Sequence, residues 1–293
     1  MKPAAFQYHA PTTVGGAVDL MAEFGDGAKV LAGGQSLIPM LALRLTAFDH
    51  LVDIGRIPAM RGVERGDGTI RIGAGTTEAE VGSSPAVGSS VPLLARATPL
   101  IGHFQIRNRG TLGGSIAHAD PAAEYPAVAA ALDAHMETES PRGSRSIPAG
   151  DFFRGLWTTS MEPDEVLVGV SFPIWPGRTG FGIEEISRRH GDFAIAGAAV
   201  AVEVDGDDRI RRCAISLIGL GPTPLRAAPA EQYLVGRRMA EVEAQEAGGA
   251  AVADLESVPA DLHGTADYRK RVGAVMVARA LAAAIREACR DGE

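Results

Sequence analysis

The sequence predicts an α+β protein of three modules, spanning residues 1–55, 56–176 and 177–293. Three observations lead to this fold class. The first module alternates short apolar runs with segments of helical spacing, which is typical of a strand–loop–helix–strand unit. From Arg56 the strand-like runs become short and are separated by turns. After the Pro- and Gly-rich stretch Pro173–Gly180, a candidate linker, long strand-like runs give way to a helical C-terminal part. A chain of 293 residues is long enough for such a division.

In the first module, TVGGAVDLMAEFG (Thr13–Gly25) places apolar residues at helical spacing and ends at a glycine. AKVLAGG, from Ala28, is predicted as a short buried strand. SLIPMLALRL, from Ser36, is predicted as a helix with Pro39 in its opening turn. HLVDIG (His50–Gly55) is a second buried strand. A glycine loop therefore lies where a strand passes into a helix.

In the second module, TIRIGAGTTEAEV predicts a strand, a turn and a helix start capped by Thr76 or Thr77. The stretch from Val91 to Thr138 predicts a helix, a long glycine-rich loop and an Ala-rich helix that runs into a strand. Short strands and turns follow as far as Ile174.

In the third module, strand-like runs between Phe181 and Ala227 are separated by a turn at Asp205–Asp208, which favours an antiparallel pair. The remainder, Glu231–Glu293, is helical in character. Its segment Arg271–Arg290 carries a strong amphipathic stripe.

The composition excludes several classes of protein. A formal net charge of −8 argues against a general nucleic-acid-binding role. Only two cysteines occur, Cys213 and Cys289, so this chain alone cannot build a cysteine-ligated iron–sulfur cluster or zinc site. The N-terminus does not resemble a signal peptide, and the longest uncharged apolar run, Phe193–Val202, is about half a membrane span. We therefore expect a protein without a membrane span, located in the reducing cytoplasm.

Two small-residue segments give the strongest indication of function, AGGQS at residues 32–36 and TLGGS at residues 111–115. Two such loops can hold the two phosphates of a dinucleotide, because glycines allow close approach of the backbone amides. Ser36 and Ser115 add hydroxyl donors, and a helix that starts after Ser36 adds the positive end of its dipole. The alternative is that each glycine pair makes only a turn.

Other motifs are weaker. GAGTTE at residues 73–78 has Glu78 where a nicotinamide-nucleotide fingerprint has its third glycine. HADPAAE at residues 118–124 is a loose pattern for a metal site, and Asp120 fits better as an acceptor for cofactor hydroxyls. SRRHGDF at residues 187–193 is either a solvated strand end or a segment facing a cofactor, with Phe193 against an aromatic ring. No nucleophile elbow, zinc-protease motif or reactive-cysteine motif occurs, so we predict no catalytic residue and no metal ligand, and any redox chemistry belongs to a cofactor.

Three stretches, AGGQSLIP, IRNRGTLGGSIAHADPAAEYPA and RRHGDFAIAGAA, resemble the FAD-binding medium subunits of the molybdenum hydroxylases. This is the family of xanthine dehydrogenase and carbon monoxide dehydrogenase, and the resemblance covers the chain from end to end. AGGQS and SRRHGDFA are more similar to bacterial dehydrogenases of N-heteroaromatic compounds of the nicotine, quinoline or caffeine type. The resemblance implies a two-part FAD-binding domain of the PCMH type, followed by a three-stranded antiparallel sheet with a helical bundle.

The resemblance also assigns residues to FAD. The two glycine segments surround the pyrophosphate, and Asp120 reaches the ribityl or ribose hydroxyls. Ile101 and His103 line the flavin pocket, Met161 and Leu167 flank the adenine, and Phe193 covers the flavin. The expected FAD-binding residues are Ala32, Gly33, Gly34, Gln35, Ser36, Leu37, Ile101, His103, Thr111, Gly114, Ser115, Ala117, Asp120, Met161, Leu167 and Phe193. One position departs from the family: many relatives have a lysine where this chain has Glu185, so the role of that lysine is not transferred.

The implied function is that of an electron-transfer subunit. A large partner subunit with a molybdopterin-bound molybdenum oxidises the substrate, and a small partner subunit with two [2Fe–2S] clusters passes the electrons to FAD. The FAD then reduces an external acceptor, and the family implies a dimer of heterotrimers. Two alternatives stay open, a free-standing PCMH-type flavin oxidase or dehydrogenase with its own substrate, and a nucleotide-binding scaffold. Neither the substrate nor the acceptor follows from these motifs.

Overall fold

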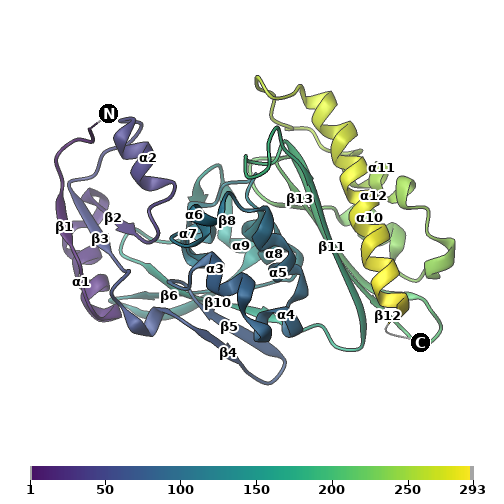
Figure 1. Ribbon diagram of the computed structural model, residues 1–293, viewed down its shortest axis with the longest axis horizontal. Coiled ribbons are helices and arrows are strands. Elements are labelled where there is room, and N and C mark those ends of the chain that lie inside the picture. Colours follow the sequence, from purple (N-terminus) through teal and green to yellow (C-terminus); the bar gives the residue numbers. More distant parts are fainter. Residues whose placement is uncertain (1, 291–293) are drawn as a thin grey trace.

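The computed structural model describes residues 2–290 and shows three parts side by side, each built around its own main sheet (Figure 1). The N-terminal part lies at the left of the view, and the sheet and helices of the C-terminal part lie at the right. The predicted α+β fold class is confirmed. The domain limits at residues 55/56 and 176/177 stay a prediction.

The first part is a three-stranded parallel sheet in the order β1-β3-β2. Its elements are β1 (Gln7–His9), α1 (Val14–Phe24), the 3-10 turn Gly25–Gly27, β2 (Ala28–Leu31), α2 (Leu37–Ala42) and β3 (His50–Asp53). Helix α1 begins where the Thr13 hydroxyl accepts a 3.1 Å hydrogen bond from the N–H of Gly16, which is an N-cap. The predicted strand–loop–helix–strand unit is confirmed, and β1 adds a third strand to it.

The second part has a five-stranded antiparallel sheet in the order β4-β5-β10-β6-β7, and a separate hairpin of β8 and β9. Its strands are β4 (Val63–Arg65), β5 (Thr69–Gly73), β6 (His135–Ser140), β7 (Gly143–Pro148), β8 (Phe153–Gly155), β9 (Thr158–Thr159) and β10 (Val166–Pro173). Its helices are α3 (Glu78–Ser83), α4 (Pro85–Ser90), α5 (Pro92–Ala97), α6 (Phe104–Arg107), α7 (Leu112–His118), α8 (Glu124–Ala131) and α9 (Ala149–Phe152), with 3-10 turns at Pro58–Met60 and Thr98–Leu100.

One expectation for this part needs correction, and one open alternative is decided. The stretch predicted as one long glycine-rich loop contains two short helices, α6 and α7, and TLGGS opens α7. Thr111 caps that helix, and the glycines are required by packing. A Cβ on Gly113 would lie 2.7 Å from the Cα of Ala74. Of the two candidate caps for α3, it is Thr77 that caps the helix, in a reciprocal pair with Glu80.

The third part is an antiparallel sheet of β11 (Arg178–Ile186), β12 (Ala196–Val204), β13 (Ile210–Ile218) and the two-residue β14 (Leu225–Arg226). The three long strands are those expected, and the turn at Asp205–Asp208 joins β12 to β13. The helices α10 (Ala228–Leu234), α11 (Ala244–Val252) and α12 (Ala266–Arg290) follow, with a 3-10 turn at Met239–Glu241. The connection from β10 to β11 spans only residues 174–177, and Trp175 in it is buried, so the expected linker is a packed turn.

Helix α12 lies directly on β11 and β12 because small residues meet there (Figure 1). A Cβ on Gly180 or Gly182 would come within 2.8 Å of a carbonyl carbon of α12. All nine residues of β12 are buried, and its alanines and valines are divided between two hydrophobic cores on opposite faces of the sheet. One core lies between this sheet and its helices, and the other joins it to the first two parts.

Candidate functional site

The loop between β2 and α2, residues 32–36, leaves its backbone N–H groups available to a ligand. Gly34 has a positive φ of 73°, a conformation that side chains with a Cβ rarely adopt. Among the hydrogen bonds within residues 2–290, none is donated by the backbone N–H of residues 33–37. Ser36 stands at the N-cap of α2 without bonding the helix through its hydroxyl. The loop therefore offers several donors that the protein itself does not use.

The start of α7 is different. The hydroxyl of Thr111 accepts a 3.0 Å hydrogen bond from the N–H of Gly114, and the N–H of Leu112 donates to the carbonyl of Thr76. The N–H of Gly113 donates to the carbonyl of Ala74. The amides of Leu112, Gly113 and Gly114 are therefore bonded within the protein and are not available to a ligand. This segment can only let a ligand approach its backbone closely, and the unbonded amides are those of the loop after β2.

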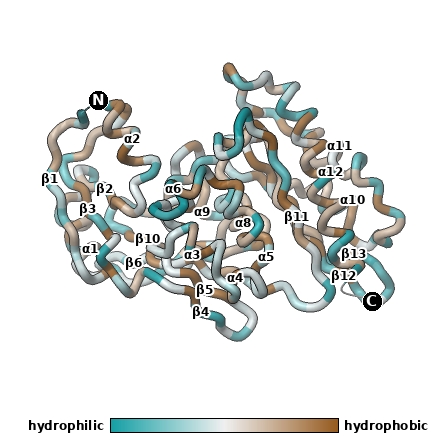
Figure 2. Tube along the Cα trace, in the orientation of Figure 1, coloured by the Kyte–Doolittle hydropathy of each residue, from teal (hydrophilic) through white to brown (hydrophobic). Residues whose placement is uncertain are grey.

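The two glycine segments come together, as the sequence predicted. A Cβ on Gly33 would lie 2.7 Å from the carbonyl carbon of Arg109, so the first loop rests directly on the backbone that leads into α7. A Cβ on Gly114 would lie 3.5 Å from the Cβ of Ala32. Figure 2 shows a hydrophilic stretch at α6, close to where this contact forms.

One face of α7 continues the site away from this contact. Leu112, Gly113 and Ile116 are buried, whereas Gly114 and Ser115 are half-buried and Ala117 is exposed. Past the end of the helix, Asp120 accepts hydrogen bonds from the N–H of Ala122 (2.8 Å) and from Nε1 of Trp157 (3.1 Å). The Trp157 ring stacks on His118 with 6.0 Å between the ring centroids, and burial lowers the pKa of His118.

The remaining expected residues are more scattered. The segment at residues 187–193 reaches the N-cap of α6, because a Cβ on Gly191 would lie 3.0 Å from the ring of His103. Phe193 is 62% exposed, Ile101 and Met161 are half-buried, and Leu167 is buried in β10 as part of the core. Their roles at FAD stay predictions.

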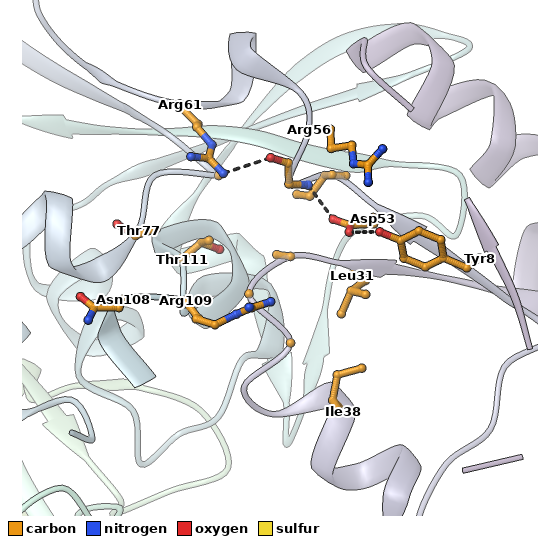
Figure 3. Close-up of a pocket in the computed structure, with 16 residues that line it drawn as sticks. Tyr8, Leu31, Ile38, Asp53, Arg56, Arg61, Thr77, Asn108, Arg109 and Thr111 are labelled. Carbon is orange, nitrogen blue, oxygen red and sulfur yellow. Dashed lines mark hydrogen bonds between the residues drawn. The ribbon is translucent and has the colours of Figure 1, made fainter. Parts of the chain in front are cut away.

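A cavity of about 670 Å³ opens between the first and second parts and contains part of this region (Figure 3). Of the expected residues, Ala32, Gly33, Gly34 and Thr111 line it. The sequence reasoning missed the other polar lining residues, which are Tyr8, Asp53, Arg56, Arg61, Thr77, Asn108 and Arg109. Asn108 and Arg109 lie inside the motif IRNRGTLGG, and Thr77 lies inside GAGTTE, where the sequence predicts it only as a helix cap. No motif or periodicity marks the other four.

Three glutamates, two in the second part and one in the third, carry raised pKa values. Burial first, and the charge of Glu185 next, raise the pKa of Glu124 to about 8. Burial raises the pKa of Glu78 to about 7, against the lowering effect of Arg107, and burial alone raises the pKa of Glu185 to about 7. Oε2 of Glu78 and Oε2 of Glu185 have no hydrogen-bond partner within the described chain.

Within residues 2–290, no three side chains of His, Cys, Asp or Glu gather as a metal site would require. In the same range no helix is both long enough and apolar enough to cross a membrane.

Comparison with known proteins agrees with this geometry. Residues 4–175 match the family model "FAD binding domain in molybdopterin dehydrogenase", and residues 182–284 match "CO dehydrogenase flavoprotein C-terminal domain". The chain is 43% identical to the carbon monoxide dehydrogenase medium chain of Hydrogenophaga pseudoflava, over 97% of this chain and 98% of that one. It is 42% identical to subunit alpha of the 6-hydroxypseudooxynicotine dehydrogenase complex of Paenarthrobacter nicotinovorans, over 98% and 97% of the two chains.

Among solved structures, a chain of carbon monoxide dehydrogenase from Hydrogenophaga pseudoflava superposes with a TM-score of 0.94 and 44% identity, covering 98% of this chain and 99% of that one. The predicted resemblance is thereby confirmed over nearly the whole length. The chain belongs to the FAD-binding medium subunits of the molybdenum hydroxylase family, and it is an oxidoreductase subunit.

Proposed function

We propose that this chain is the electron-transfer subunit of a molybdenum-dependent dehydrogenase complex. A small partner subunit with two [2Fe–2S] clusters delivers electrons to the FAD of this chain, and an external acceptor removes them. A large partner subunit with a molybdopterin-bound molybdenum oxidises the substrate, and two such heterotrimers pair. Its relatives named as medium chains or complex subunits support this assembly. The two cysteines, neither in a disulfide within the described residues, suit a cytoplasmic complex.

The observation that carries the proposal is the set of free amides at residues 33–37. A diphosphate needs several hydrogen-bond donors, and this loop has donors that no protein group uses. Its positive-φ glycine and its contact with the backbone before α7 fix the loop in that form. The residues present therefore fit FAD. When bound, FAD supplies the redox chemistry, since it exchanges electrons singly or in pairs.

The residues of this chain then bind FAD, orient it and shield it from water. We assign the pyrophosphate to Ala32, Gly33, Gly34, Gln35, Ser36 and Leu37, with Thr111, Gly114, Ser115 and Ala117 closing the second side. Asp120 accepts from the ribityl or ribose hydroxyls. Ile101, His103 and Phe193 border the flavin, and Met161 and Leu167 border the adenine.

The experiment is purification of the chain alone and with its partners. The chain alone should be yellow, release FAD on acid denaturation, and fail to oxidise CO or N-heteroaromatic substrates. In the assembled complex, rapid mixing with substrate should reduce the clusters before the flavin. Turnover by the isolated chain would instead favour a free-standing flavin enzyme. A colourless chain that takes up no FAD would contradict the flavin role.

A further inference from the structure

A buried arginine lies one turn into α12. Arg269 is only 5% exposed, although it belongs to the end of the helix where the positive end of the dipole disfavours a cation. Its Nε has no hydrogen-bond partner within residues 2–290. Burial of a charged group lowers stability unless that group is paired and hydrogen-bonded. The bonds of its two Nη atoms therefore decide what this arginine does.

The guanidinium of Arg269 joins three segments of the third part. Nη1 donates a 2.6 Å hydrogen bond to the carbonyl of Ile195, and a longer one of 3.4 Å to the carbonyl of Gly219. Nη2 donates to both carboxylate oxygens of Asp261, at 2.8 Å each. The bond from Arg269 first, and a 2.8 Å bond from the N–H of His263 next, lower the pKa of Asp261. Arg269 is thereby held between a main-chain carbonyl and an anchored carboxylate.

The segment 187–195, which connects β11 to β12, depends on this arginine for one of its few bonds. Among the described residues, its other hydrogen bonds to the rest of the chain are only two. The N–H of Ile195 donates a 2.7 Å bond to the carbonyl of Ile186, and Nη1 of Arg188 lies 3.4 Å from Nδ1 of His263. The bond from the arginine is the shortest of the three, so it is a main restraint on the end of the segment.

Gly219 lies at the same joint. It has a positive φ of 70°, and a Cβ on it would lie 3.0 Å from the carbonyl oxygen of Ile195. Its N–H donates a 2.8 Å hydrogen bond to the carbonyl of Pro121, the neighbour of Asp120. Strands β11 and β13 end, and β12 begins, at the end of the sheet where α12 starts (Figure 1). The joint therefore meets both the segment of Phe193 and the loop of Asp120, two residues expected at FAD.

We propose that Arg269, held by Asp261, is a positioning residue that fixes the segment 187–195 so that Phe193 covers the flavin. The inference rests on the proposed function, because it takes FAD to lie against Phe193. It gives α12, which supplies none of the residues expected to contact FAD, a part in shaping the flavin site.

The test compares Arg269→Met with two control variants of the full chain. Arg271→Met changes an exposed arginine of the same helix, which has no bonded partner among the described residues. Arg226→Met removes another arginine that joins the third part to the second, because Arg226 forms a 2.7 Å ion pair with Asp133. Neither control residue bonds the segment 187–195 within the described chain.

The first readout needs no FAD. Trypsin cuts after arginine, and the segment contains the exposed residues Arg188 and Arg189, which become susceptible when the segment opens. Loss of the bonds from Arg269 should speed this cleavage about tenfold in the FAD-free chain, because a lost hydrogen bond of a charged group favours the open form. The two controls should be cut there at the wild-type rate.

The second readout uses the FAD-loaded chain. Arg269→Met should bind FAD about tenfold more weakly in a fluorescence titration, because the covering ring is no longer held in place. The visible circular dichroism of the bound flavin should change as it does in Phe193→Ala, since both variants remove that ring from the flavin. Arg269→Lys keeps the charge and a donor, and it should restore part of the affinity.

Cleavage of Arg269→Met at the wild-type rate would overturn the proposal. Equally fast cleavage of Arg226→Met would overturn it as well, because the effect would then come from general stability. Fast cleavage with unchanged FAD affinity would mean that the segment does not border the flavin, and this result too would overturn it. A wild-type chain that takes up no FAD would contradict the proposed function instead, and the trypsin result would still decide whether Arg269 holds the segment.

Discussion

Gly33 lies against the backbone of Arg109, so closely that a Cβ at position 33 would come within 2.7 Å of the Arg109 carbonyl carbon. This contact joins the loop after β2, in the first part, to the segment that leads into α7, in the second. The position of the free amides of residues 33–37 therefore depends on a glycine, and on packing between segments more than 70 residues apart.

We expect Gly33→Ala to weaken both the fold and the site, because the obstacle is backbone and cannot rotate away. The cost should be about 3 kcal/mol, seen as a fall of several degrees in melting temperature, together with loss of FAD. Gly15→Ala in α1 is the control, since a Cβ there meets nothing within 4 Å. It should leave FAD binding unchanged and stabilise the chain slightly. An unaltered melting temperature for Gly33→Ala would show that the loop can move aside.

Gly34→Ala tests the loop conformation. An alanine at φ of 73° costs about 1 kcal/mol, and its Cβ would lie 3.0 Å from Ile38. The loop should relax and misplace its amides, so FAD affinity should fall at least tenfold in a fluorescence titration. Gly143→Ala in the β6–β7 turn also places a Cβ at a positive φ, of 107°, but in open space and away from the loop. If both variants lose FAD equally, general instability and not loop geometry is responsible.

Variants of Asp120 and Trp157 separate two roles of the Asp120 carboxylate: binding the cofactor, and accepting the hydrogen bond from the indole of Trp157. We expect Asp120→Asn to weaken FAD binding about tenfold, because the amide keeps one acceptor oxygen but loses the second one and the negative charge that accept from cofactor hydroxyls. Trp157→Phe removes the 3.1 Å indole hydrogen bond to Asp120 and should change the affinity much less. Equal losses in the two variants would mean that Asp120 acts only by holding the β8–β9 hairpin.

The buried Glu124 predicts a pH-dependent stability. Its pKa rises from an ordinary 4.5 to about 8, first through burial and next through the charge of Glu185. Since the folded chain holds this proton more tightly than the unfolded chain, the stabilisation is complete below pH 4.5 and is lost as the pH rises towards 8. The free energy of unfolding should therefore fall over this range.

The matched variants are Glu124→Gln and Glu64→Gln, the latter at an exposed position on β4. Glu124→Gln should be more stable than the wild type at pH 8.5, by roughly 1–3 kcal/mol in denaturant titrations, and nearly equal to it at pH 5. Glu64→Gln should show no such difference. Glu185→Gln should move the stability transition to lower pH, because it removes the charge that raises the pKa of Glu124.

The sequence alone determined the family, the α+β class and the first glycine loop. These follow from local signals, since strand-to-helix passages, glycine pairs and turn residues act over a few positions. AGGQS, TLGGS and RRHGDF could be read without the fold, and the structure brings the first two into contact.

The tertiary structure decided what these segments can do. TLGGS became a helix start because Thr111 caps it and Ala74 and Thr76 take its amides, so that only the first loop keeps free donors. Arg56, Arg61 and Arg109 are separated in the sequence, and they line one cavity only because the first two parts pack together. The pKa of Glu124 likewise depends on its burial and on Glu185, 61 positions further along the chain. The lining of the cavity and the pKa of Glu124 both depend on burial and on contacts between residues distant in the sequence. Such contacts produce no periodic pattern in the sequence, so they could not be predicted from it.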